Sequence, residues 1–115
     1  MASTFKNAGM TVGVVDNSSA DLYTAGGSET AVVHAIYLSN ASSANVAKVT
    51  IKVTVDGGST IYHVGKNLEI PANNTLTLDK PINLENNDIL RVVADPSPDS
   101  TSVAVEAVAS ILAIT

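Results

Sequence analysis

Short stretches in which apolar and polar residues alternate dominate the chain. The clearest runs from Val49 to Asp56, where β-branched apolar residues take one face and Thr, Lys, Thr and Asp take the other. A period of two is typical of a half-buried β-strand. Residues 56–59 then supply Asp-Gly and Gly-Gly, which tolerate tight turns, and Thr60–Val64 follows as a second strand. The pattern predicts an antiparallel hairpin.

Further strands are predicted on both sides of this hairpin. Thr30–Ser39 is apolar on both faces, which suits a central strand, and strict alternation places His34 on one face with Ile36 and Leu38. Residues 40–45 and 95–100 have the composition of loops. The other expected strands are Thr11–Val15, Leu22–Ala25, Lys66–Ile70, Thr75–Leu78, Ile82–Leu84, Ile89–Ala94 and Ser102–Ile114.

Eight or nine short strands, separated by Gly, Pro and Asn turns and without a convincing amphipathic helix, predict an all-β fold. We expect a single-domain antiparallel β-sandwich of the jelly-roll or Ig-like type. A chain of 115 residues has room for one hydrophobic core. Residues 1–19 are expected to form an N-terminal arm and the first strand, as a candidate contact segment, and residues 20–115 the β-sandwich core.

Composition narrows the function classes. The chain has no cysteine, which excludes a disulfide scaffold, a thiolate zinc site, an iron–sulfur cluster and a cysteine nucleophile. Six Lys and Arg against eleven Asp and Glu leave a net charge of −5, so neither nucleic acid nor an anionic membrane is an expected partner. Since the first residues do not resemble a signal peptide and no apolar run reaches about 18 residues, we expect synthesis as a soluble chain in the cytoplasm.

Candidate chemistry is sparse. His34 and His63 are the only histidines, and neither lies in a paired metal-binding spacing or beside a Gly-x-Ser-x-Gly nucleophile motif. The oxygen-rich residues 16–21 and 85–88 lack the pattern of a calcium loop, and turn chemistry explains them. We therefore expect no enzyme activity, no metal and no cofactor. Four aromatic residues are too few for a sugar-stacking row.

What remains is an interaction surface. A β-sandwich has unpaired edge strands, and apolar residues at both ends of a chain poor in charge favour covering these edges by association. We expect a homo-oligomer, a dimer or a trimer, with Phe5, Met10, Val12 and Val14 as the interface residues. The alternative is that both ends fold back as strands of the same sheet.

Five stretches, taken in order, encode turns and core positions of a sandwich and span residues 20–115. They are Leu22–Ala25 before a Gly-rich turn, Val33–Asn40, Ile70–Leu76, Leu84–Leu90 and the closing alternation that ends at Ile114. As a set, these stretches resemble small virion structural proteins of tailed bacteriophages.

The resemblance implies a non-enzymatic capsid decoration (cement) protein that binds the outer surface of a shell and stabilises the seams between its subunits. Its implied partners are the major capsid protein or other virion proteins, and no catalytic residue carries over. Two alternatives stay open within a structural role: a neck or tail component, and a fibre-associated component. From other classes we keep a glycan-binding adhesion module, with a concave patch around Tyr62 and His63, and, ranked last, a small hydrolase or metal-dependent enzyme.

Overall fold

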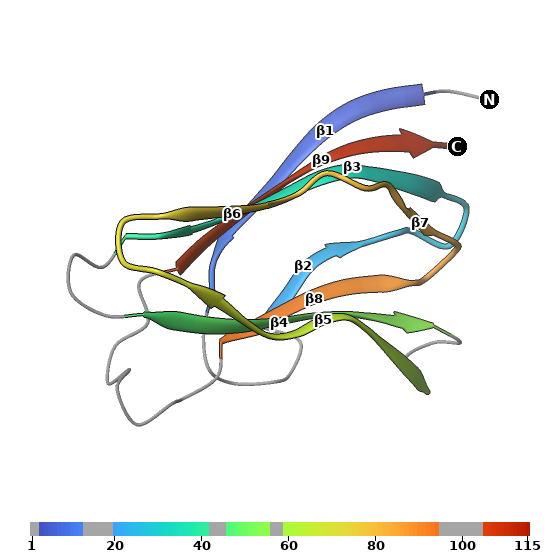
Figure 1. Ribbon diagram of the computed structural model, residues 1–115. Helices are drawn as coiled ribbons and strands as arrows, with labels where there is room; N and C mark the ends of the chain where they lie inside the picture. Colours follow the sequence, from blue (N-terminus) through green and yellow to red (C-terminus); the bar gives the residue numbers. More distant parts are fainter. Residues whose placement is uncertain (1–2, 13–19, 42–45, 56–58, 95–104) are drawn as a thin grey trace.

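The computed structural model describes residues 3–12, 20–41, 46–55, 59–94 and 105–115. These residues form nine strands in two antiparallel sheets that face each other (Figure 1). Within the described ranges, no helix is long and apolar enough to cross a membrane. The strands are β1 (Ser3–Thr11), β2 (Asp21–Thr24), β3 (Thr30–Asn40), β4 (Ala47–Val55), β5 (Thr60–Ile70), β6 (Thr75–Leu78), β7 (Ile82–Leu84), β8 (Ile89–Ala94) and β9 (Val105–Ile114).

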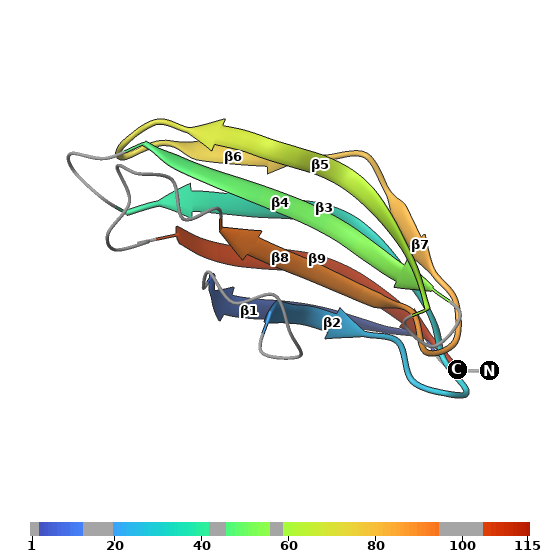
Figure 2. The ribbon, with the colours of Figure 1, turned by 90° about the horizontal axis from the view of Figure 1, so that it is seen from below.

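The strand order is that of a jelly roll. Sheet A has the order β1-β9-β3-β6, with β7 also paired to β3, and sheet B has the order β2-β8-β4-β5. Because β6 and β7 share one edge of sheet A, each sheet has four strand positions. The chain changes sheet at every connection except β4–β5 and β6–β7, and this crossing pattern is what produces the jelly roll. The predicted antiparallel β-sandwich is confirmed, and Figure 2 shows β1 and β2 at one margin and β5 and β6 at the other.

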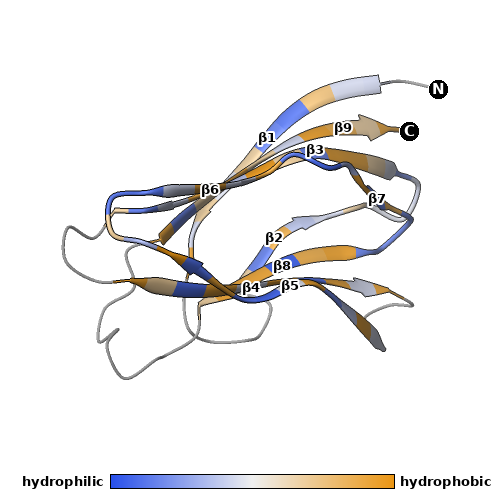
Figure 3. Cartoon of the chain, in the orientation of Figure 1, coloured by the Kyte–Doolittle hydropathy of each residue, from blue (hydrophilic) through white to orange (hydrophobic). Residues whose placement is uncertain are grey.

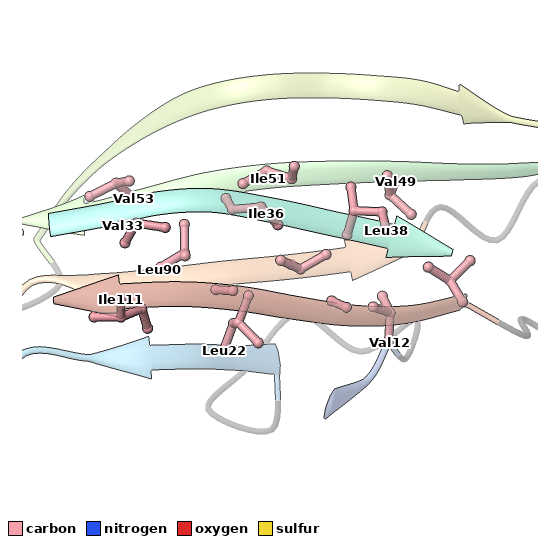
Figure 4. Close-up of a cluster of buried hydrophobic side chains, with 14 of the residues drawn as sticks. Val12, Leu22, Val33, Ile36, Leu38, Val49, Ile51, Val53, Leu90 and Ile111 are labelled. Atoms are coloured by element: carbon pink, nitrogen blue, oxygen red, sulfur yellow. The ribbon is translucent and has the colours of Figure 1, made fainter. Parts of the chain in front are cut away.

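The core lies between the two sheets, where each strand directs alternate apolar residues inward. β9 shows this pattern without interruption, because its residues alternate between buried and exposed or half-buried from Val105 to Ile114. Figure 3 shows hydrophobic residues along the strands of both sheets and hydrophilic residues at the turn between β7 and β8. Side chains from both sheets meet in the close-up of Figure 4. The largest fully buried ones are Ile36, Leu38, Ile51, Ile70, Leu84, Leu90, Ile111, Val12, Val33, Val49, Val92 and Val105.

A β-bulge in β3 corrects the predicted faces of this strand. The register against β9 shifts between Val33 and Ala35, so His34 is an extra residue that points outward. Before the bulge Val33 is buried, and after it Ile36 and Leu38 are buried. Strict alternation placed His34 with Ile36 and Leu38, and that prediction is wrong because one inserted residue moves every later side chain to the other face.

The first strand also differs from its prediction. We expected Thr11–Val15, whereas β1 ends at Thr11 and residues 13–15 lie outside the described residues. β1 escaped prediction because it is an edge strand whose side chains are mostly exposed, so its sequence carries little apolar alternation. It pairs with β9 from Ser3↔Ile114 to Thr11↔Glu106. β1 and β9 therefore both belong to sheet A, as in the alternative that both ends fold back as strands of the same sheet.

The other predicted strands are found with small changes. The hairpin of β4 and β5 is confirmed, but β5 continues through Lys66–Ile70, which we had predicted as a separate strand. β6, β7 and β8 have the expected bounds, and β9 confirms the long C-terminal strand. The loop was predicted over residues 40–45, but Asn40 is the last residue of β3, and residues 42–45 lie outside the described residues. The predicted loop 95–100 and turn residues 56–58 also lie outside them.

Asparagine makes the two corner turns. Asn73 and Asn87 have φ of 61° and 66°, in the left-handed region that Asn tolerates better than most residues. The N–H of Asn74 donates to Pro71 O in the first turn and that of Asp88 donates to Glu85 O in the second. Both turns were predicted as strand corners, and each one carries the chain from one sheet to the other.

Candidate interaction surface

The four predicted interface residues have different environments. Phe5 is 78% exposed, Met10 is half-buried against the core, and Val12 is only 2% exposed. Val14 lies outside the described residues. Val12 is therefore used inside the fold, since its side chain fills the core, and Phe5 is the member of the set that presents a large apolar side chain at the surface. An interface role for the segment stays a prediction.

The outer face of sheet A presents further apolar side chains beside Phe5. The strand register aligns Phe5 with Leu112 of β9, and Leu112 with Val32 of β3. A second row aligns Val108 with Tyr37, and both are 43% exposed. Sequence reasoning missed these rows because it treated each strand separately, whereas the rows arise only from the pairing of β1, β9 and β3. The signal that could have revealed these rows is that outward positions of β9, such as Val108 and Leu112, are apolar.

Charge separates the outer faces of the two sheets. On the outward positions of β1, β9, β3, β6 and β7, Glu106 is the only acidic residue and there is no lysine or arginine. On sheet B, Arg91 Nε donates to Asp21 Oδ1 at 2.7 Å, and Lys52 pairs with Arg91 in register. Removing charged groups from water is costly, so the outer face of sheet A, with one acidic residue and no lysine or arginine, loses little hydration on contact with another protein.

A polar cluster ties β1 to sheet B at one end of the sandwich. The Tyr23 hydroxyl donates to a carboxylate oxygen of Glu29, and Lys6 Nζ lies 3.7 Å from the other oxygen. The same amine lies 5.8 Å from the centre of the Tyr23 ring. Asn86 Nδ2 donates to Glu29 O at 2.6 Å, which joins the turn between β7 and β8 to the cluster. Burial, followed by the hydrogen bond and the negative charge of Glu29, raises the pKa of Tyr23 to about 12.

The raised pKa predicts a loss of stability in alkali. The folded state holds the Tyr23 proton more tightly than the unfolded chain does, because the pKa rises from 10.0 to about 12 on folding. The stabilisation is complete below pH 10 and is lost as the pH passes through 12. We expect the free energy of unfolding of the wild type to fall more steeply over this window than that of Tyr23→Phe, measured by urea unfolding. If the free energies of unfolding of the two proteins changed in parallel with pH, this prediction would be wrong. The control is Tyr62→Phe, because Tyr62 is 63% exposed.

The two histidines do not form a site together. His34 projects from the bulge of β3 in sheet A, and its ring centre lies 6.4 Å from that of Phe5. His63 lies on β5 in sheet B. Among the described residues, no group of three or more His, Cys, Asp or Glu is placed to hold a metal ion. In the turn of residues 85–88, an oxygen of Asp88 accepts from the Glu85 N–H at 2.9 Å, which is the turn chemistry expected for it.

The two residues of the predicted concave patch, Tyr62 and His63, do not share a face of β5. These residues are neighbours on β5, opposite Val53 and Lys52, so their side chains point to different faces of sheet B. A groove of about 290 Å³ does lie close by, but neither residue lines it. It is lined by Val64, Thr77, Leu78, Asp79, Lys80, Pro81 and Ile82.

Comparisons with known proteins detect fold similarity but no sequence relative. No protein-family model matches the chain, and no curated protein matches it. A chain in the acid-stable capsid structure of Helicobacter pylori bacteriophage KHP30 is similar over 100% of this chain and 89% of its own length, with 14% identity and a TM-score of 0.53. A chain of the T13 viral particle of IBDV (infectious bursal disease virus) is similar over 96% of this chain, with 11% identity and a TM-score of 0.54. This chain spans only 30% of that longer one. At these identities the similarity shows the fold.

Proposed function

We propose that this chain is a non-enzymatic structural component of a tailed phage virion, a decoration protein that binds the outer surface of the capsid shell. The observation that carries the proposal is the jelly-roll fold, which is similar along the whole chain to a chain of a phage capsid. Its partners are the shell protein and further copies of itself, and its location is the assembled particle. A neck, tail or fibre position is the alternative within the same structural role.

Two properties of the surface support this role. The nearly uncharged outer face of sheet A is suited to contact with another protein, because few charges lose their hydration there. The net charge of −5 suits a position outside the shell, away from packaged DNA. A decoration protein needs no chemistry, since many copies that each bury a modest area stabilise a shell together.

The test is a copy count in purified particles. We expect quantitative mass spectrometry to give a ratio of this chain to the major shell protein near one, or a simple fraction of it. A handful of copies per particle would overturn decoration in favour of the neck or tail, and absence from the particle would overturn the virion role. As a second measurement, adding the purified chain to particles that lack it is expected to raise the temperature at which they release DNA.

A further inference from the structure

The four sheet edges of the sandwich are not equally protected. Sheet A ends at β1 on one side and at β6 and β7 on the other, and sheet B ends at β2 and β5. An edge strand has unpaired N–H and C=O groups that pair readily with another strand, so natural sheets block their edges with short strands, bulges, prolines or charges.

Three of the four edges carry such blocks. β2 has four residues and a register shift between Asp21 and Tyr23. The edge formed by β6 and β7 is split by residues 79–81, which include a proline. β5 has irregular register against β4, and its Asn67 has a φ of 53°. None of these edges offers a long regular strand to a partner.

β1 is different. It runs for nine residues without proline, keeps an unbroken register against β9, and has no strand on its outer side among the described residues (Figure 2). Its one charged residue is Lys6, and lysine is a common blocking residue on edges. Here the Lys6 amine is held by Glu29 and faces the Tyr23 ring, so it is directed to sheet B and away from the open edge.

Side chains on β1 define which strand fits this edge. Phe5 and Gly9 share the outer face, and both are exposed. A Cβ placed on Gly9 would meet its nearest atoms, Ala107 O and Val108 Cγ2, at the ordinary contact distances of 3.6 and 3.8 Å, so the exposed Gly9 leaves a side-chain position vacant beside Val108. If a second β1 pairs antiparallel about Asn7, each Phe5 ring lies opposite the Gly9 of the other copy. A large exposed ring then covers a residue that has no side chain.

We propose that two copies of this chain pair antiparallel through β1, with Asn7 at the two-fold axis, so that the two A sheets become one continuous sheet. The register is self-complementary, because both Phe5–Gly9 contacts form at once, as an isologous interface requires. It also sets each Lys6 opposite Ala8 rather than opposite the other Lys6. The contact of the Phe5 ring with the His34 ring, at 6.4 Å between centres, leaves Phe5 78% exposed in the single copy. This pairing goes beyond the proposed virion role and does not depend on it.

The first test is the mass of the purified full chain in solution, by sedimentation velocity over a concentration series. We expect a dimer of the 11.8 kDa chain. Phe5→Ala and Gly9→Val are each expected to raise the dissociation constant at least about tenfold. Gly9→Val is expected to fold, since the neighbours of the new Cβ are at ordinary contact distance. The matched control is Tyr62→Ala, which removes an exposed aromatic ring from the edge strand β5 and is expected to leave dimerisation unchanged.

The second test fixes the register and keeps the wild-type fold. The chain has no cysteine, so a single introduced thiol reports on one contact. Opposed residues of antiparallel strands have Cα atoms about 4.5–5.5 Å apart, within the range of a disulfide. We expect Asn7→Cys to form a covalent dimer on oxidation. Thr11→Cys is the control, because its copies would lie about 27 Å apart in this register.

Three results would overturn the pairing: a wild type that stays monomeric at every soluble concentration, a trimer, or cross-linking of Asn7→Cys no faster than that of Thr11→Cys. All three concern the purified chain in solution, so they are distinguishable from a failure of the virion role, which is tested on particles.

Discussion

Replacing Leu38 by alanine is expected to lower the free energy of unfolding by about 2–5 kcal/mol. Leu38 is fully buried in the middle of sheet A, paired with Ala107 on one side and Leu76 on the other. Its side chain points into the cluster that joins the two sheets (Figure 4). Since β3 is held by strands on both sides, the backbone cannot move inward to fill the cavity. Urea unfolding followed by circular dichroism measures the loss.

The matched control is Ile61→Ala, which removes a side chain of the same volume from the edge strand β5. Ile61 is 47% exposed, so its truncation is expected to cost about 1 kcal/mol or less. Equal losses at the two positions would mean that the space between the sheets is not the main source of stability. The free energy of unfolding of a domain of this size is only about 5–15 kcal/mol, so the Leu38 variant also tests how much of that stability a single core residue supplies.

Asn40→Asp is expected to destabilise the protein by about 3 kcal/mol or more at neutral pH. Asn40 is 2% exposed, and its Nδ2 donates to Ile70 O at 2.9 Å while its backbone N–H donates to Asn74 O. It therefore holds both ends of the corner that takes the chain from β5 in sheet B to β6 in sheet A. The substitution replaces a donor by a carboxylate oxygen and sets it against a carbonyl oxygen in the interior.

The pH dependence of this variant has a definite sign. Burial disfavours the charged form, so the pKa of the introduced carboxyl is higher in the folded state than its ordinary value of about 3.9. The protonated carboxyl can donate to Ile70 O, so the deficit relative to the wild type is smallest below about pH 3.9 and grows as the pH rises. Asn74→Asp is the control, because Asn74 makes the same kind of bond, to Ala72 O, at an exposed position. A deficit independent of pH would contradict the explanation.

Prediction from the sequence succeeded where alternation was strong. The hairpin of β4 and β5 and the long strand β9 were predictable because buried apolar residues recur at every second position. The two Asn corners were predictable because Asn accepts the left-handed backbone that they need. These local signals were sufficient for the β-sandwich, whereas the strand order depends on pairings between distant residues.

Prediction from the sequence failed where the backbone departs from the regular two-residue alternation of a strand or where strand pairing decides a residue's position. Nothing in the composition around His34 signals that one residue is inserted there, yet the bulge reverses the faces of β3. Val12 was assigned to an interface because it is apolar and near an end of the chain, but it is buried in the core. The proposed role of Phe5 and Gly9 in pairing could not be predicted from the sequence, because it depends on β1 being an open sheet edge, and only the strand order shows this.

The pairing of Ser3 with Ile114 places the two ends of the described chain side by side at one end of the sandwich (Figure 1). A peptide fused to the start of β1 and another fused to the end of β9 would therefore emerge together from the same end of the fold. If the protein covers a shell in many copies, each fusion would be repeated in a regular array over the particle. The fold would then serve as a scaffold that presents two different cargoes as an adjacent pair.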